Sequence, residues 1–73
     1  KAISGETIEK MLLQAVNFLP EKQKIVFELK YFQQKKYKEI AAILEISEGG
    51  CKASYFHAVK KVEENLKTQL NLL

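Results

Sequence analysis

A break in helical periodicity within residues 37–61 constrains the fold of this 73-residue chain more than any other feature. Before the break, apolar residues recur at spacings of three and four and define one stripe of a two-turn helix: Tyr37, Ile40, Ala41 and Leu44. After it, Ser47 is a suitable N-cap for a longer helix with a second apolar stripe: Cys51, Tyr55, Ala58, Val62 and Leu66. A short helix, a tight turn and a longer helix are the pattern of a helix-turn-helix unit.

In a helix-turn-helix unit the first helix supports the second, whose N-terminal half can lie in the major groove of DNA. The positions that we expect to be exposed there are mostly small or polar: Glu48, Gly49, Gly50, Lys52, Ala53, Phe56 and His57. Periodicity alone is equally consistent with one helical hairpin of an all-helical domain, so both interpretations stay open at this point.

Chain length and composition indicate a single globular domain over residues 1–73. Hydrophobic residues make up 47% of the chain and charged residues 29%, a globular composition. The longest apolar run is far shorter than the roughly 20 residues of a membrane span. The single cysteine fits a reducing, cytoplasmic setting. The sequence supplies no nucleophile–base pair, carboxylate pair or metal-ligand set, so we expect no enzyme, no cofactor and no metal site.

Positive charge is concentrated in the centre of the chain. The net charge is +3, but residues 22–61 hold nine lysines and four glutamates, a surplus of five positive charges. A basic centre suits a polyanion, because each lysine that meets a phosphate releases counterions. Lysine is also the commonest solvating residue on helices, so charge alone does not separate the two interpretations. All twelve basic residues are lysines, which bind phosphate as point charges and lack the bidentate geometry of arginine.

Two further helices are expected before the helix-turn-helix pattern. The first runs from a cap at Ser4 to about Leu19, and its wide apolar face predicts burial on more than one side; this face comprises Ile8, Met11, Leu12, Leu13, Ala15, Val16, Phe18 and Leu19. The second runs from Pro20 to about Phe32, and its aromatic residues should form the middle of the core. The apolar C-terminal tail, up to Leu73, either packs back on the first helix or meets another protein.

Two positions around the short helix depart from favourable helix chemistry. Lys36 precedes Tyr37, so the helix lacks a side-chain N-cap of the usual type. Glu45 stands where helix-turn-helix turns commonly need a residue with positive φ. We therefore expect either backbone strain at Glu45 or a turn of different shape.

The chain resembles region four of bacterial sigma factors of the extracytoplasmic-function group. The resemblance is carried in order by LPEKQKIVFELKYF (residues 19–32), by YKEIAAIL-EIS-EGG (37–50) and by the HAVKKVEENL ending (57–66). It implies a four-helix domain that recognises the minus-35 promoter element and docks on the flap of the RNA polymerase β subunit, with an anti-sigma factor as a further partner. It also implies that the chain is the C-terminal part of a longer protein, since no upstream region two is visible.

The resemblance places the recognition helix at residues 47–61 and assigns the base-facing positions to Glu48, Gly49, Gly50, Lys52, Ala53, Phe56 and His57. Around them, the expected phosphate contacts are Lys35, Lys36, Lys38, Ser47, Lys60 and Lys61. Four features depart from the family pattern. Glu45 replaces the common turn glycine, Gly50-Cys51 replaces Thr-Val, Lys36 replaces a serine cap, and the late arginines are absent.

The sequence therefore predicts an all-α, compact four-helix domain with a C-terminal helix-turn-helix and no wing. The predicted function is binding of double-stranded promoter DNA in transcription initiation. Two alternatives remain: an output domain of the response-regulator type, and a protein-interaction module that keeps the fold without DNA binding.

Overall fold

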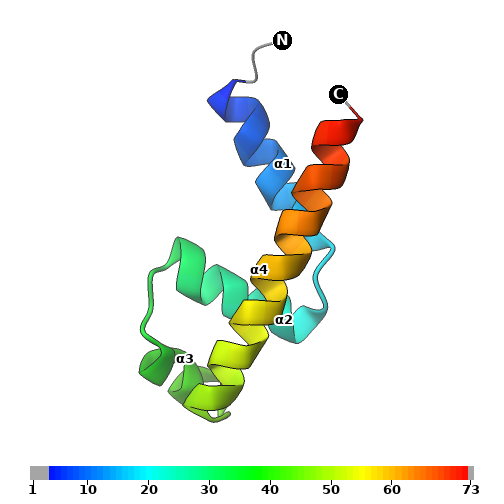
Figure 1. The fold of residues 1–73 in the computed structure, drawn as a ribbon. Helices are drawn as coiled ribbons and strands as arrows, with labels where there is room; N and C mark the ends of the chain where they lie inside the picture. Colours follow the sequence, from blue (N-terminus) through cyan, green and yellow to red (C-terminus); the bar gives the residue numbers. More distant parts are fainter. Residues whose placement is uncertain (1–3, 73) are drawn as a thin grey trace.

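The computed structural model describes residues 4–72 and confirms the all-α prediction. Four α-helices follow one another along the chain (Figure 1). They are α1 (Gly5–Asn17), α2 (Glu21–Phe27), α3 (Tyr37–Leu44) and α4 (Glu48–Asn71), and a π-helical segment, η1 (Glu28–Phe32), continues α2. No strand occurs within residues 4–72. None of the described helices is both long enough and apolar enough to cross a membrane.

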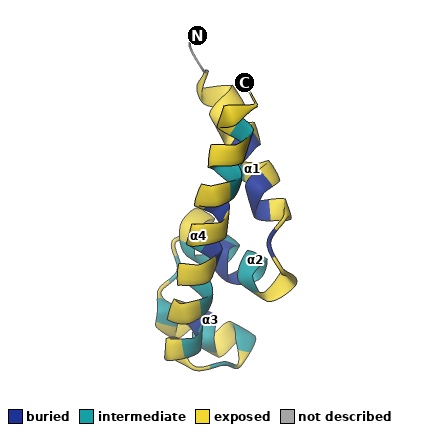
Figure 2. Cartoon of the chain, turned by 45° about the vertical axis from the view of Figure 1, so that its right-hand side comes forward, coloured by how far each residue is buried: buried dark blue, intermediate teal, exposed yellow. Residues whose placement is uncertain are grey.

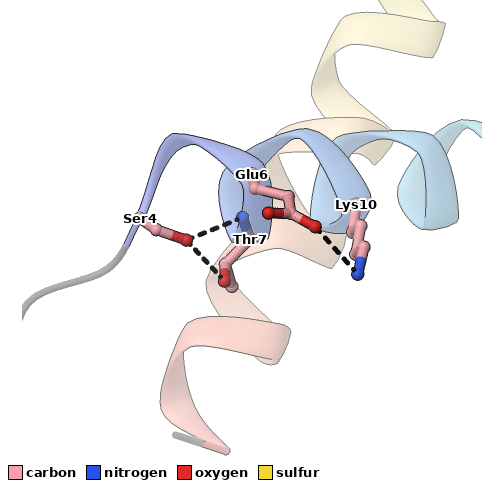
Figure 3. Close-up of polar contacts among 4 residues, drawn as sticks. All are labelled: Ser4, Glu6, Thr7 and Lys10. Carbon is pink, nitrogen blue, oxygen red and sulfur yellow. Dashed lines mark hydrogen bonds and ion pairs between the residues drawn. The ribbon is translucent and has the colours of Figure 1, made fainter.

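The N-terminus of α1 is capped as the sequence predicts. The Thr7 N–H donates to Ser4 Oγ (3.1 Å), and the hydroxyl groups of Ser4 and Thr7 lie 2.9 Å apart. One turn on, Glu6 and Lys10 form an exposed ion pair of 3.4 Å (Figure 3). The bond from Thr7 to Ser4 satisfies one of the backbone donors that the first turn of a helix leaves free. The helix ends at Asn17, two residues before the predicted end.

The segment predicted as one helix from Pro20 to Phe32 is in fact α2 followed by the π-helical η1. The Gln33 N–H donates to the Glu28 carbonyl (3.2 Å), five residues back, in place of the α-helical partner. This wider turn rotates the later residues away from the apolar stripe of α2. Phe27 is 3% exposed, whereas Tyr31 and Phe32 are 51% and 45% exposed. The prediction that the whole aromatic group lies in the core is therefore wrong for Tyr31 and Phe32.

The core consists of two clusters along α4. The upper cluster joins α1 and α2 to the middle of α4 and contains Ala15, Val16, Leu19, Phe27, Ala58 and Val62. The lower cluster contains Val26 of α2, Ile40 of α3 and Cys51 of α4, each 0% exposed. Tyr55 packs against both clusters. The predicted stripes of α3 and α4 thus face the interior, and Cys51 is a small core residue as expected.

The apolar face of α1 is covered on one side only. Met11, Ala15 and Val16 are buried, but Ile8 and Leu13 are each 53% exposed and Phe18 is 71% exposed. The expectation of burial on more than one side is wrong, because α4 is the main neighbour along this helix (Figure 2). Three large apolar side chains of this segment consequently face solvent.

The C-terminal half of α4 runs antiparallel to α1, with both termini at one end of the molecule (Figure 1). The Gln69 side-chain amide donates to the Met11 carbonyl (2.9 Å) and to Asn65 Oδ1 (2.7 Å). Leu66 and Gln69 thus pack back on the first helix, so the first of the two predicted outcomes is confirmed for this part of the tail only. Leu70 and Leu72 remain exposed, and Leu73 lies outside the described residues.

The turn between α3 and α4 adopts the strained alternative predicted for Glu45. Its φ and ψ angles are 56° and 44°, in the left-handed region. The Ile46 N–H donates to the Ala41 carbonyl (3.1 Å), and the Glu45 N–H also bonds to that carbonyl. These bonds close the end of α3 as in a Schellman-type C-terminus, where glycine is the favoured residue.

Replacing Glu45 with glycine should stabilise the domain. The left-handed conformation costs a non-glycine residue roughly 1–2 kcal/mol, and the entropy of glycine in the unfolded chain cancels part of the gain. We expect Glu45→Gly to raise the free energy of unfolding by about 0.5–1 kcal/mol, measured by urea denaturation. The control, Ala42→Gly in the exposed interior of α3, should lower it by about 1 kcal/mol. Equal losses in both variants would show that Glu45 is unstrained.

Candidate nucleic-acid interface

The candidate interface begins at the N-terminus of α4, where Ser47 is the cap. The Gly50 N–H donates to Ser47 Oγ (2.9 Å), and the Cys51 N–H donates to the Ser47 carbonyl (3.0 Å). The first turn of α4 therefore starts where the sequence places it. Its first residue, Glu48, is an acidic group next to the positive end of the helix dipole.

One face of the N-terminal half of α4 is buried and the opposite face is open to solvent. Cys51 and Ala58 anchor the buried face in the core. The seven residues predicted to face bases lie together on the outer side; Gly50 is half-buried, and the others are exposed: Glu48, Gly49, Lys52, Ala53, Phe56 and His57. The fold thus gathers these positions on one accessible surface, which we call the α4 outer face.

The two glycines of this face differ in their surroundings. A Cβ atom added at Gly49 would have Ser47 Oγ as its nearest neighbour, at 4.0 Å, which is ordinary contact distance. At Gly50 the added Cβ would lie only 3.1 Å from Ser47 Oγ. Gly50 therefore protects the cap, whereas Gly49 has no such structural role.

An exposed aromatic side chain stands at the centre of the α4 outer face. Phe56 is 58% exposed. Its ring meets the His57 ring edge to face, with the centroids 5.7 Å apart, and Lys60 Nζ lies 5.3 Å from the Phe56 centroid. An exposed apolar ring flanked by a cation and an imidazole can contact both the apolar and the charged parts of a nucleic acid.

The predicted phosphate-binding residues occupy four places. Lys36 and Lys38 are exposed, and Lys35 half-buried, around the N-terminus of α3, while Ser47 caps α4. Lys60 leans towards Phe56, but Lys61 lines a hollow beside Phe18 on the α1 side of the helix. The structure therefore separates Lys61 from the other predicted contacts, because successive helical residues point in different directions.

The missing side-chain cap of α3 is partly replaced from within the helix. Lys36 has no acceptor on its side chain, as expected. Instead, Glu39 reaches back and its Oε1 accepts the Lys36 N–H at 2.8 Å. This bond is one half of a capping box, and it leaves the Lys36 ammonium exposed to solvent.

Sequence reasoning missed a contact between lysines and an aromatic ring at the edge of the interface. Lys30 Nζ of η1 lies 4.5 Å from the Tyr37 ring centroid, and Lys52 Nζ of α4 lies 5.8 Å from it. No local pattern links Lys30 to Tyr37, since a connection without helical periodicity separates them. Only the packing of η1 against α3 brings them together.

Tyr55 links the interface to the core. Burial raises the pKa of its hydroxyl above 10.0, and the neighbouring Tyr37 and Tyr31 raise it further. Tyr55 is therefore a neutral side chain at physiological pH. Its ring stacks on Phe27 (5.7 Å) and meets Tyr37 edge to face (6.3 Å), so Tyr37 is held against the core.

A second surface lies on the side of α4 where Tyr31 projects. It is an apolar groove of about 240 Å³ between α1, α2 with η1, and α4, lined by Leu12, Phe27, Tyr31, Tyr55, Val59, Val62, Glu63 and Leu66. Among the described residues, no three His, Cys, Asp or Glu side chains gather as a metal site would require.

Residues 9–62 match the family described as Sigma-70, region 4. The chain is also similar to the RNA polymerase sigma factor FliA of Escherichia coli strain K12, with 30% identity over 59 residues, which are 81% of this chain and 25% of that protein. FliA of Yersinia enterocolitica is 30% identical over 81% of this chain and 26% of its own length. The chain therefore spans about a quarter of the length of the curated relatives that it matches.

Alanine substitutions at the two glycines should differ in their effect on stability. Gly49→Ala removes a flexible residue from the first helical turn without a steric conflict, so the free energy of unfolding should rise by up to about 1 kcal/mol. Gly50→Ala places a methyl group against the cap. Its free energy of unfolding should therefore be about 1 kcal/mol lower than that of Gly49→Ala. Thermal unfolding of both variants measures the difference. Equal stabilisation would show that the cap moves aside freely.

Proposed function

The chain belongs to the Sigma-70, region 4 family, and we propose that it binds promoter DNA in transcription initiation as the C-terminal domain of an RNA polymerase sigma factor. The observation that carries this proposal is the packing of α3 against the buried side of α4, which leaves the α4 outer face exposed. The resemblance to the extracytoplasmic-function group supports the minus-35 element as the target. The working location is then the cytoplasm, and the domain itself performs no catalysis.

In the proposed complex, α4 lies in the major groove with its outer face towards the bases. Phe56 or Ala53 contacts a thymine methyl group, and His57 forms a hydrogen bond with a base edge. Glu48, Gly49, Gly50 and Lys52 border the same groove. The phosphate backbone of the DNA is bound by five residues: Lys35, Lys36, Lys38, Ser47 and Lys60. Lys61 contributes only if its side chain leaves the hollow beside Phe18.

Weak intrinsic affinity is expected from this interface. A single module of this kind buries on the order of 600–1,000 Å² of protein surface. The phosphate contacts are lysines, which act as point charges without bidentate geometry. Useful affinity would arise when the domain is tethered to polymerase, through the effective concentration that tethering supplies.

The second proposed partner is the RNA polymerase core, through the flap of its β subunit. The apolar groove beside Tyr31 supports this part of the proposal, because a groove lined by apolar and aromatic side chains suits the apolar face of a helix. An anti-sigma factor would compete for the same surfaces. The groove and the α4 outer face involve different residues, so the two partners can be tested separately.

Substitution of Phe56 should weaken selective DNA binding. We expect Phe56→Ala and His57→Ala each to lose about 1–3 kcal/mol of binding free energy for a duplex selected from a random pool. Their affinity for the unselected pool should change little. Fluorescence anisotropy at several salt concentrations measures both quantities. The matched control is Phe18→Ala. Phe18 is also an exposed phenylalanine, but it lies on the α1 side of α4, beside Glu64 and Thr68 and away from the α4 outer face.

Loss of affinity in Phe18→Ala equal to that in Phe56→Ala would contradict the assignment of the α4 outer face. If the folded domain binds no duplex even at low salt, DNA recognition is excluded. The remaining function is then a protein-interaction module.

Substitution of Tyr31 should weaken binding to polymerase core without affecting DNA. Tyr31 is 51% exposed and borders the groove, so Tyr31→Ala removes contact area while leaving Phe27 in the core. We expect the variant to lose about 1–2 kcal/mol of binding free energy for the core enzyme, measured in a pull-down or anisotropy titration. Phe18→Ala again serves as the control. Unchanged core binding in Tyr31→Ala would place the polymerase contact elsewhere.

A further inference from the structure

The ring of Tyr37 brings together two lysines that come from different elements. Lys30 belongs to η1 and Lys52 to the second turn of α4, yet their ammonium groups lie 4.5 and 5.8 Å from the same ring centroid. Cations at such distances from an aromatic face are attracted by its quadrupole. The ring therefore restrains two side chains that would otherwise sample many rotamers.

Tyr37 is itself held in place by contacts with the core, so its ring can restrain the two lysine side chains. It is half-buried, packs against the cluster of Val26, Ile40 and Cys51, and meets Tyr55 edge to face at 6.3 Å. Tyr55 in turn joins both core clusters. The ring consequently has a fixed position relative to α4, and so have the lysines that rest on it.

Neither lysine forms an ion pair with a carboxylate of the described residues. Within residues 4–72, the ion pair with an N–O distance below 4.0 Å is Glu6–Lys10, at the opposite end of the molecule. Two positive charges near one ring repel each other, and no carboxylate within residues 4–72 forms an ion pair with either lysine. An anionic ligand would do so.

We propose that Tyr37 is a positioning residue that holds Lys30 and Lys52 as contacts to DNA backbone phosphates on the α3 side of the recognition helix. This inference rests on the proposed DNA-binding function. It adds Lys30 to the interface and moves Lys52 from base reading to backbone contact. The first helix of a helix-turn-helix unit crosses the DNA backbone, and Tyr37 lies in the first turn of that helix.

The chemistry favours phosphate over a base edge for this pair. Lysine ammonium groups are compact point charges, which suit phosphate oxygens without a defined orientation. Lys52 leans towards Tyr37 and thus towards the flank of α4, whereas Phe56 and His57 occupy the central part of its outer face. Phosphate contacts position the domain and carry no sequence information directly.

The test is DNA binding by the 73-residue chain across a salt series, using a selected duplex and a scrambled one. Each phosphate contact contributes roughly 0.9 to the slope of log affinity against log salt. We expect Lys30→Gln and Lys52→Gln each to reduce that slope by about 1 and to weaken binding to both duplexes by the same factor. The matched control is Lys67→Gln, the same charge change at an exposed position near the other end of α4, which should leave the slope unchanged.

Tyr37 variants test the positioning role directly. Tyr37→Phe keeps the ring and should retain the wild-type slope. Tyr37→Leu removes the ring while remaining apolar, and should reduce the slope and the affinity in a sample whose thermal unfolding shows that it is folded. If Tyr37→Leu does not fold, Lys30→Gln and Lys52→Gln still decide the phosphate contacts.

Slopes for Lys30→Gln and Lys52→Gln equal to that of Lys67→Gln would overturn the inference while leaving the proposed DNA binding intact. A loss of preference between the two duplexes in Lys52→Gln would also overturn it, because Lys52 would then read bases. Absence of any binding by the wild-type chain would overturn both the inference and the proposed function.

Discussion

The contact of Val26, Ile40 and Cys51 is the constraint on which the rest of the structure depends. Each residue comes from a different helix, and each is 0% exposed. Because interiors are packed at crystal-like density, three fully buried side chains leave little freedom in the angle between α3 and α4. The 24 residues of α4, about 36 Å long, then extend from this contact to α1 and carry the second core cluster.

Local features that look unfavourable are tolerated because this packing determines the geometry. Glu45 keeps a left-handed backbone that glycine would adopt at lower cost, and Ile46 beside it packs against the same cluster. Strain of this kind persists when the surrounding structure fixes it. The consequence is a turn that presents Ser47 and the first turns of α4 to solvent. The outer face is thus the product of buried contacts on the other side of the helix.

The sequence predicted the parts of the fold that follow helical periodicity. The caps at Ser4 and Ser47, the stripe through Cys51, Ala58 and Val62, and the unusual backbone at Glu45 all follow from local patterns. The π-helical turn could not be predicted, since a shift from i→i+4 to i→i+5 bonding leaves no mark in the periodicity of a five-residue segment. Exposure of Phe18 depends on which neighbour covers α1. The grouping of Lys30 with Tyr37 likewise depends on tertiary contact, so the exposure of the α4 outer face could be predicted and the lysine contact at its flank could not.

The most direct test of the account is an NMR titration of the 15N-labelled chain with a short duplex selected for binding. The largest amide shift changes should occur in residues 47–57 at the start of α4, with further changes near Lys30 and Tyr37. The amides of α1 and of the C-terminal turns of α4 should change little. Changes concentrated around the groove of Leu12, Tyr31 and Leu66, with none at the start of α4, would contradict the claim that α4 is the recognition helix.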